Sequence, residues 1–173
     1  ATSDGSAPNY IGTFGWVIAL PNHIRLARHC GPVYGYKVRS FCAEAYGLLS
    51  ALRFIIRAFE YTGIPFPTVI ELFTDSLSVN RTISKHLEYQ SYYPGTTLDA
   101  DWDVLQAIQT AIHQIPSIVN LQHVKGHQDR LRPYSSLPRP VQLNVDMDRL
   151  DTAYWRFLFF EGTTIPIPSI HSI

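Results

Sequence analysis

The segment from Thr68 to Thr74 constrains the fold more than any other part of this 173-residue chain. It is a short apolar run with β-branched residues, which is typical of a buried parallel strand. Amphipathic helices are predicted on both sides of it, over about residues 40–60 and 77–87. A helix, a strand and a second helix in this order predict an α/β protein with parallel strands in its sheet.

The remaining apolar patterns add strands before this unit and a strand and helices after it. Alternating and aromatic residues predict strands, whereas apolar residues spaced i, i+3, i+4 predict helices. The expected order is three strands, a helix, a strand, two helices, a strand and a final helix. The additional elements are a short extended segment ending at Asp4, strands at residues 12–20, 24–34 and 118–124, and helices at residues 99–115 and from about Gln142 to Phe160.

Composition narrows the class of protein. A hydrophobic content of 46% fits a globular chain. With 14 basic and 14 acidic residues the net charge is +0, so binding to a polyanion must be local or helped by a partner. The two cysteines, Cys30 and Cys42, form no C-x-x-C pair and favour reduced thiols of an intracellular protein. No signal peptide and no membrane-spanning apolar run is present, so no membrane partner is expected.

The length suits one domain, which we expect over residues 1–161, followed by a tail or linker at residues 162–173. The first residue is not Met, and only three residues precede Asp4. We therefore expect a domain of a longer protein, with the strand that holds Asp4 cut short.

Four acids lie where α/β sheets collect ligands. Asp4 and Asp75 end predicted strands, and Glu44 and Asp148 lie near the starts of predicted helices. Each has an ordinary explanation as well: Asp4 as a turn residue, Glu44 as an acid that complements a helix dipole, and Asp75 as a helix N-cap. If the strands of Asp4 and Asp75 are parallel neighbours, both carboxylates reach the same sheet edge, and the helix of Glu44 crosses over it.

Four carboxylates in one small site repel one another, because like charges raise each other's pKa. Divalent cations remove this repulsion, and oxygen ligands select hard ions such as Mg²⁺ or Mn²⁺. Two such ions about 3.5–4 Å apart can clamp the attacking and leaving oxygens of a phosphodiester displacement. The acids therefore indicate metal-dependent phosphoryl chemistry.

Five short motifs follow one another along the chain: Thr2-Ser3-Asp4-Gly5-Ser6, Cys42-Ala43-Glu44-Ala45, Phe73-Thr74-Asp75-Ser76, Val124-Lys125-Gly126-His127 and Leu143-Asn144-Val145-Asp146-Met147-Asp148-Arg149-Leu150. In this order the chain resembles type I ribonuclease H domains, and it is most similar to those attached to reverse transcriptases of retroelements. The resemblance covers nearly all of the chain to about residue 158. It implies an α/β ribonuclease H-like fold with a mixed five-stranded sheet, three antiparallel strands then parallel strands, and helices on both faces.

The resemblance also implies an activity. It is that of a Mg-dependent endonuclease, ribonuclease H, which cleaves the RNA strand of RNA–DNA hybrids as part of a retroelement polyprotein fused to a reverse transcriptase. Two Mg²⁺ ions, with Mn²⁺ as a substitute, would be held by Asp4, Glu44, Asp75 and Asp148. His127 corresponds to the family's loop histidine, which assists proton transfer or product release.

The fourth metal ligand has two candidates. Asn144 and Asp148 reproduce the family's Asn-x-x-x-Asp spacing, so Asp148 is the first choice. Asp151 lies one helical turn further on nearly the same face and is the reserve, whereas Asp146 points elsewhere.

The chain departs from the family where relatives contact the substrate. The usual Asn-rich lead into the helix acid is here Ser40-Phe41-Cys42. Recognition of RNA is therefore expected to rest on groups near Gly5, Ser6, Ser40 and Cys42. Few cations are available for phosphate contacts; the best candidates are Arg25, Arg28, Lys37 and Arg39. The loop from His127 to Asn144 is long and contains prolines, which puts the reach of His127 in question.

Three other kinds of protein are alternatives to an active ribonuclease H. A transposase or integrase on a related fold needs the order Asp, Asp, Glu, but Glu44 precedes Asp75. A proofreading exonuclease needs Asp-x-Glu at the first strand, where Ser6 stands instead. The alternative that remains is a catalytically degenerate ribonuclease H-like connection domain of a reverse transcriptase, against which the presence of all four acids counts.

Overall fold

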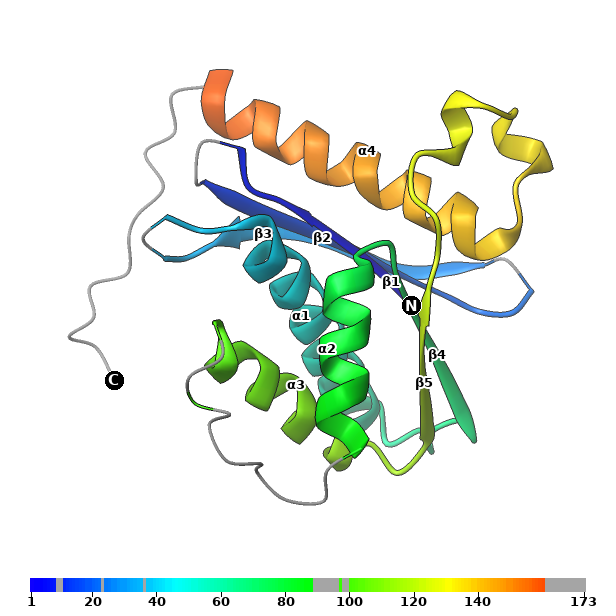
Figure 1. The fold of residues 1–173 in the computed structure, drawn as a ribbon. Helices are drawn as coiled ribbons and strands as arrows, with labels where there is room; N and C mark the ends of the chain where they lie inside the picture. The colour runs from blue at the N-terminus through cyan, green and yellow to red at the C-terminus, as the bar shows by residue number, and fades with distance from the viewer. Residues whose placement is uncertain (9–10, 23, 36, 89–96, 98–99, 161–173) are drawn as a thin grey trace.

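The fold is a mixed sheet with helices on both faces (Figure 1). The computed structural model describes residues 1–8, 11–22, 24–35, 37–88, 97 and 100–160. The strands are β1 (Thr2–Ser6), β2 (Gly12–Ala19), β3 (Arg25–Val33), β4 (Val69–Thr74) and β5 (Ile118–His123). The helices are α1 (Ser40–Thr62), α2 (Leu77–Glu88), α3 (Trp102–Gln114) and α4 (Arg139–Phe160), with short 3₁₀ turns η3 (Gln128–Arg130) and η4 (Tyr134–Ser136).

The strands lie in the order β3-β2-β1-β4-β5. β1, β2 and β3 pair antiparallel, whereas β4 pairs parallel with both β1 and β5. In Figure 1, α4 runs along one face of the sheet, and α1, α2 and α3 gather on the other. The predicted fold class is therefore confirmed. Residues 161–173 lie outside the described residues, so the expected division into a domain and a tail stays a prediction.

The first strand is fully paired despite its position at the chain start. β1 pairs with β2 along all five of its residues, from Thr2 opposite Val17 to Ser6 opposite Thr13. The amino group of Ala1 also donates a 2.6 Å hydrogen bond to the carbonyl of Glu71. The expected loss of support for Asp4 is thus not seen: its strand is held on both edges.

Helix α1 lies directly on β1 because Gly5 has no side chain. A Cβ atom at Gly5 would stand 2.3 Å from the carbonyl carbon of Ala43 and 2.5 Å from the amide nitrogen of Glu44. Buried apolar residues on the same helix, Leu48, Leu52 and Ile55 among them, then pack into the main core. The contact at Gly5 therefore sets the distance between β1 and the part of α1 that carries Glu44.

Helix α1 starts at Ser40, as predicted, with Arg39 in extended backbone at the N-cap position, and Glu44 lies just beyond the first turn. The predicted start of α4 is wrong. α4 begins at Arg139 because Pro140 is compatible with a first helical turn. Asp148 consequently lies in the third turn of α4 and not near its start. β3 runs through Gly31 and Pro32 to Val33, within the predicted range of residues 24–34.

In the part of the chain that the structure describes, none of the helices is long and apolar enough to cross a membrane.

Substituting Gly5 tests the contact between α1 and β1. We expect Gly5→Ala to lower the free energy of unfolding by about 1–3 kcal/mol or more, because backbone atoms of α1 occupy the space of the new methyl group. The neighbouring strand glycine, Gly15, is the control, since its nearest atoms would lie at 3.6 Å or more, an ordinary contact. Urea unfolding of both variants measures the difference. Equal stability of the two would contradict a close contact at Gly5.

Candidate metal centre

Three carboxylates meet where β4 ends beside the middle of β1. The prediction that Asp4 ends its strand is wrong, because pairing with β2 extends β1 through Gly5 to Ser6, whereas Asp75 directly follows β4 as predicted. Because β1 and β4 are parallel and Ser3 pairs with Thr74, Asp4 and Asp75 occupy equivalent positions one residue further on. Glu44 reaches the same place from α1. One carboxylate oxygen from each of the three residues lies within 4.8 Å of the other two. Three acids separated by 40 and 31 positions in sequence thus form one oxygen-rich cluster.

Asp75 is held from several sides. The side-chain amide of Asn144 donates a hydrogen bond to Asp75 Oδ2 at 3.1 Å, and Asn144 itself is 1% exposed. Gly126 lets the loop after β5 approach, since a Cβ atom there would lie 2.4 Å from Asp75 Oδ2. The alternative role of Asp75 as a helix cap falls to Ser76, whose hydroxyl accepts a bond from the amide of Val79 at 3.4 Å. The Asp75 carboxylate is therefore directed at the cluster.

Burial makes the cluster electrostatically strained. The pKa of Asp4 is raised well above its usual value, first by burial and then by the charges of Asp75 and Asp151, although its bond from the Gly5 amide, at 2.7 Å, acts in the opposite direction. The pKa of Glu44 is likewise raised, by burial first and then by Asp4 and Asp75. The charge of Asp75 therefore makes it harder to ionise both Asp4 and Glu44.

The donor set fits a hard divalent cation. All three groups offer oxygen atoms, which Mg²⁺ and Mn²⁺ prefer. Glu44 Oε2 is also buried and has no hydrogen-bond partner among the described residues, which is costly for a carboxylate oxygen unless a ligand completes it. Asp4, Glu44 and Asp75 could thus hold a metal ion in the arrangement that they already have.

The two candidates for a fourth ligand have different surroundings. Asp148 is outside the three-oxygen group; its Oδ2 lies 3.6 Å from His127 Nδ1, and both side chains are partly exposed. Asp151 is 3% exposed and accepts a 2.5 Å bond from the hydroxyl of Ser6. Burial raises the pKa of Asp151, while hydrogen bonds from Ser6 and Thr13 lower it. The Asp151 carboxylate is therefore bonded to β1, whereas Asp148 lies with His127 on the solvent-exposed side of the cluster, here called its open side.

Of the residues expected to contact substrate, some are covered or already bonded and others are exposed. Gly5 is covered by α1, and the Ser6 hydroxyl bonds to Asp151. Cys42 is half-buried, and burial together with Asp101 raises its pKa to about 12. Ser40 is exposed at the start of α1. Cys30 and Cys42 are both free thiols.

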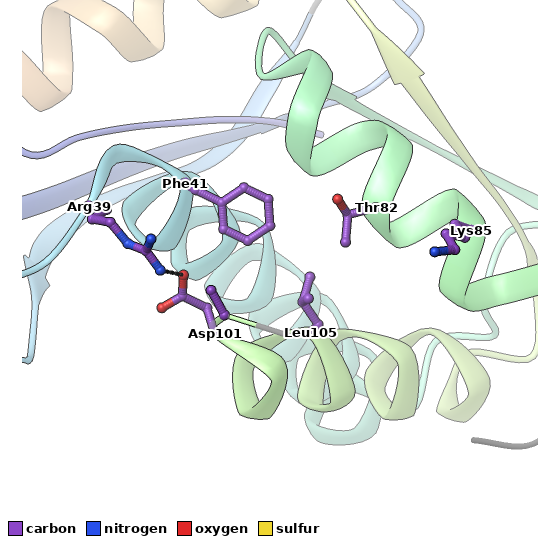
Figure 2. Close-up of a pocket in the computed structure, with 7 residues that line it drawn as sticks. Arg39, Phe41, Thr82, Lys85, Asp101 and Leu105 are labelled. Atoms are coloured by element: carbon purple, nitrogen blue, oxygen red, sulfur yellow. Dashed lines mark hydrogen bonds and ion pairs between the residues drawn. The ribbon is translucent and has the colours of Figure 1, made fainter. Parts of the chain in front are cut away.

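A hollow that carries two basic side chains lies between the start of α1 and helices α2 and α3 (Figure 2). Its volume is about 350 Å³, and it is lined by Arg39, Phe41, Thr82, Lys85, Ala100, Asp101 and Leu105. In Figure 2 the guanidinium of Arg39 points to the carboxylate of Asp101, at 3.4 Å. None of the three clustered acids lines it, but its lining residue Phe41 precedes Glu44 by three positions on α1, about one helical turn.

Sequence reasoning missed several parts of this site. The spacing of Asn144 drew attention to Asp148, but not to the bond that Asn144 makes with Asp75. Gly126 was noticed only as part of a motif, although its missing side chain makes room for Asp75. Thr13 carried no signal, because its place beside Ser6 follows from the register of β1 and β2.

Comparisons with known proteins place this geometry in a known fold. No protein-family model matches the chain, and no curated protein matches it. Among solved structures, the prototype foamy virus RNase H domain is similar with a TM-score of 0.62 and 22% identity, over 88% of this chain and 90% of that one. The N-terminal RNase H domain of a Mycobacterium tuberculosis protein gives 0.62 and 17%, over 93% and 95%. The chain has a ribonuclease H-like fold.

The same ribonuclease H-like fold is found within a larger viral enzyme. The foamy viral protease-reverse transcriptase in complex with an RNA/DNA hybrid is similar with a TM-score of 0.60 and 16% identity, over 88% of this chain and 19% of that protein. This agrees with the resemblance to reverse transcriptase-linked domains that the motifs indicate.

The raised pKa values of Asp4 and Glu44 predict how pH affects the stability of this ribonuclease H-like domain. Ionising these carboxyls is less favourable in the folded state, so without metal their effect destabilises the fold as pH rises from about 4 through the raised pKa values. We expect Asp4→Asn to be more thermostable than the wild type in chelator at about pH 8, with the difference shrinking toward about pH 4. Thermal unfolding at several pH values measures it.

The wild type must be compared with Asp4→Asn because another group has the opposite effect on stability as pH rises. Burial lowers the pKa of the Ala1 amino group to about 6, so that group favours folding as pH rises. Both proteins share Ala1, and their difference isolates the carboxylates. Mg²⁺ should stabilise the wild type and leave Asp4→Asn nearly unchanged. A wild type that is the more stable of the two in chelator at high pH would contradict the strained cluster.

Proposed function

We propose that this domain is a Mg-dependent ribonuclease H, an endonuclease that hydrolyses the RNA strand of RNA–DNA hybrids. The observation that carries the proposal is that carboxylate oxygens of Asp4, Glu44 and Asp75 lie within 4.8 Å of one another, with Asp4 buried and the pKa values of Asp4 and Glu44 raised. The ribonuclease H-like fold supports it, because in similar solved structures this fold occurs in RNase H domains.

Metal binding is the part of the mechanism that the cluster supports most directly. When bound, two Mg²⁺ ions, or Mn²⁺ in their place, supply a polarised water and neutralise charge at the phosphodiester. Asp4, Glu44 and Asp75 would hold these ions, Glu44 through its Oε2, which has no hydrogen-bond partner among the described residues. The bond from Asn144 and the space at Gly126 hold the carboxylate of Asp75 in one orientation.

Asp148 and His127 complete the proposed site on its open side. Burial, Asp75 and Asp151 are the larger causes of the raised pKa of Asp4, and Asp148 adds a smaller effect in the same direction from outside the three-oxygen group. We assign Asp148 as the fourth metal ligand and Asp151 as a buried anchor of α4. His127, next to Asp148, is placed to take up or release a proton as product leaves.

The substrate would approach across the start of α1. The hollow between α1, α2 and α3 carries Arg39 and Lys85, which can contact backbone phosphates, and Thr82, whose hydroxyl can donate to them. Ser40 is exposed near the same place and is the best remaining candidate for contact with a 2′-hydroxyl. A net charge of +0 favours a fused reverse transcriptase as the source of further phosphate contacts, in an intracellular retroelement protein.

The activity is tested by assaying the domain on an RNA–DNA hybrid and on double-stranded RNA, with Mg²⁺ and with chelator. We expect cleavage of the RNA strand of the hybrid only, and only with Mg²⁺. Asp75→Asn should lower kcat by more than about 100-fold, because it removes a charged metal ligand.

A matched variant guards against a general effect of removing a negative charge. Glu60→Gln removes an exposed carboxylate that pairs only with Arg57 on the far part of α1, and it should leave kcat unchanged. If the wild type cleaves no hybrid while the folded domain binds it, the connection-domain alternative is correct instead.

Asp148 and Asp151 are separated by comparing activity with stability. Asp148→Asn should weaken Mg²⁺ binding and lower kcat with little change in Tm, since its side chain is 41% exposed. Asp151→Ala should lower the free energy of unfolding by about 1–3 kcal/mol, because Ser6 and Thr13 lose their buried acceptor. Calorimetric Mg²⁺ titration and urea unfolding measure the two effects. If Asp151→Ala abolishes Mg²⁺ binding and Asp148→Asn does not, the assignment is reversed.

A further inference from the structure

The segment between β5 and α4, residues 124–138, carries His127 and is here named the His127 loop. Its length and prolines put the reach of His127 in question, yet the structure places His127 Nδ1 3.6 Å from Asp148 Oδ2. His127 has a φ of 53°, a left-handed conformation that costs free energy for a residue with a side chain, although less for histidine than for most. Contacts of the neighbouring residues therefore help to hold this turn.

Three amides show that the turn is folded in itself. The backbone N–H of Arg130 donates to the carbonyl of His127 at 3.4 Å, and those of Leu131 and Arg132 donate to the carbonyl of Gln128 at 3.1 Å. These bonds shape η3, but they do not tie it to the rest of the protein.

Arg149, the residue after Asp148, makes that tie. Its guanidinium lies 3.7 Å from the carboxylate of Asp129 in η3. The same guanidinium lies over the ring of Tyr134 in η4, 5.6 Å from the ring centre. Arg149 thus holds both halves of the His127 loop from one position on α4.

Tyr134 fixes the second half of the loop to the helix. Its hydroxyl donates a 2.9 Å hydrogen bond to Asp146, and Arg25 from β3 donates to both Asp146 and the Tyr134 oxygen. The ring also packs against a small apolar cluster of Leu137, Val141 and Val145. Tyr134 is therefore held in place by several contacts, and Arg149 packs over its ring.

We propose that Arg149, supported by Tyr134, is a positioning residue that keeps His127 beside Asp148. The proposal rests on the proposed function, because the position of His127 matters only if His127 takes part in turnover. Arg149 touches neither the acidic cluster nor His127 in the structure; it acts on His127 through Asp129 and Tyr134. Exposed ion pairs are weak singly, but here one side chain closes two contacts at once.

The test is a double-mutant cycle of Arg149→Gln with His127→Ala, assayed on the hybrid. We expect Arg149→Gln to lower kcat about threefold to tenfold with KM unchanged, which corresponds to about 0.7–1.4 kcal/mol. In the His127→Ala background the same substitution should have no further effect, since residues that act through one another are not additive. Arg149→Lys should restore part of the loss, because it keeps the charge over Tyr134 and beside Asp129.

Arg156→Gln is the matched control, because it removes an exposed arginine about two turns further along α4. It should leave kcat and KM unchanged. A rise in KM with kcat unchanged for Arg149→Gln would overturn the proposal, since it would make Arg149 a phosphate contact. Full additivity with His127→Ala would overturn it as well.

Amide hydrogen exchange gives a readout that does not depend on activity. Arg149→Gln should speed exchange at Arg130, Leu131 and Arg132 and leave exchange in β4 and β5 unchanged. If the wild type cleaves no hybrid, the proposed function fails, while faster exchange in the variant still supports the tie between Arg149 and the loop. Unchanged exchange at these three amides overturns that tie.

Discussion

The close contact between α1 and β1 at Gly5 is the constraint on which the site depends. With no side chain at Gly5, the backbone of Ala43 and Glu44 lies where a Cβ atom would be. That contact sets Glu44 against Asp4, and the parallel pairing of β1 and β4 adds Asp75. A backbone approach of a few tenths of an ångström more or less would change the spacing between Glu44 and the other two carboxylates. The core packing of α1 therefore also determines the geometry of the metal centre.

The cluster that results is unfavourable by itself. Burial and the charge of Asp75 raise the pKa values of Asp4 and Glu44, and within the described part of the chain one oxygen of Glu44 has no hydrogen-bond partner. The fold has to supply the stability elsewhere, and it does so in the apolar cores on the two faces of the sheet. A site that is strained without cations and complete with them is what metal-dependent chemistry needs, because ligand positions are then fixed before the metal arrives.

The sequence predicted the fold class and the three converging acids well, because both depend on local patterns. Strand ends and helix faces follow from short-range periodicity, and Asp4 and Asp75 meet once β1 and β4 are parallel. Helix starts were less accurate: nothing local indicated that Arg139 and Pro140 belong to α4, so Asp148 was placed about one turn too near the start of the helix. The partners of Asp151 could not be foreseen, since Ser6 and Thr13 join it only through sheet register and helix packing.

The His127 loop shows why such contacts escape sequence reasoning and still bear on function. Its prolines and length favour a variable position, and judged by these alone His127 would be remote from the acids. Three of four successive residues on α4, Asp146, Asp148 and Arg149, instead contact the loop at Tyr134, His127 and Asp129. None of these pairs is a recognisable motif, because each joins residues 12 to 21 positions apart across a loop. The helix that carries the proposed fourth ligand thus also sets the place of the histidine, so the two groups on the open side of the site are positioned by one element.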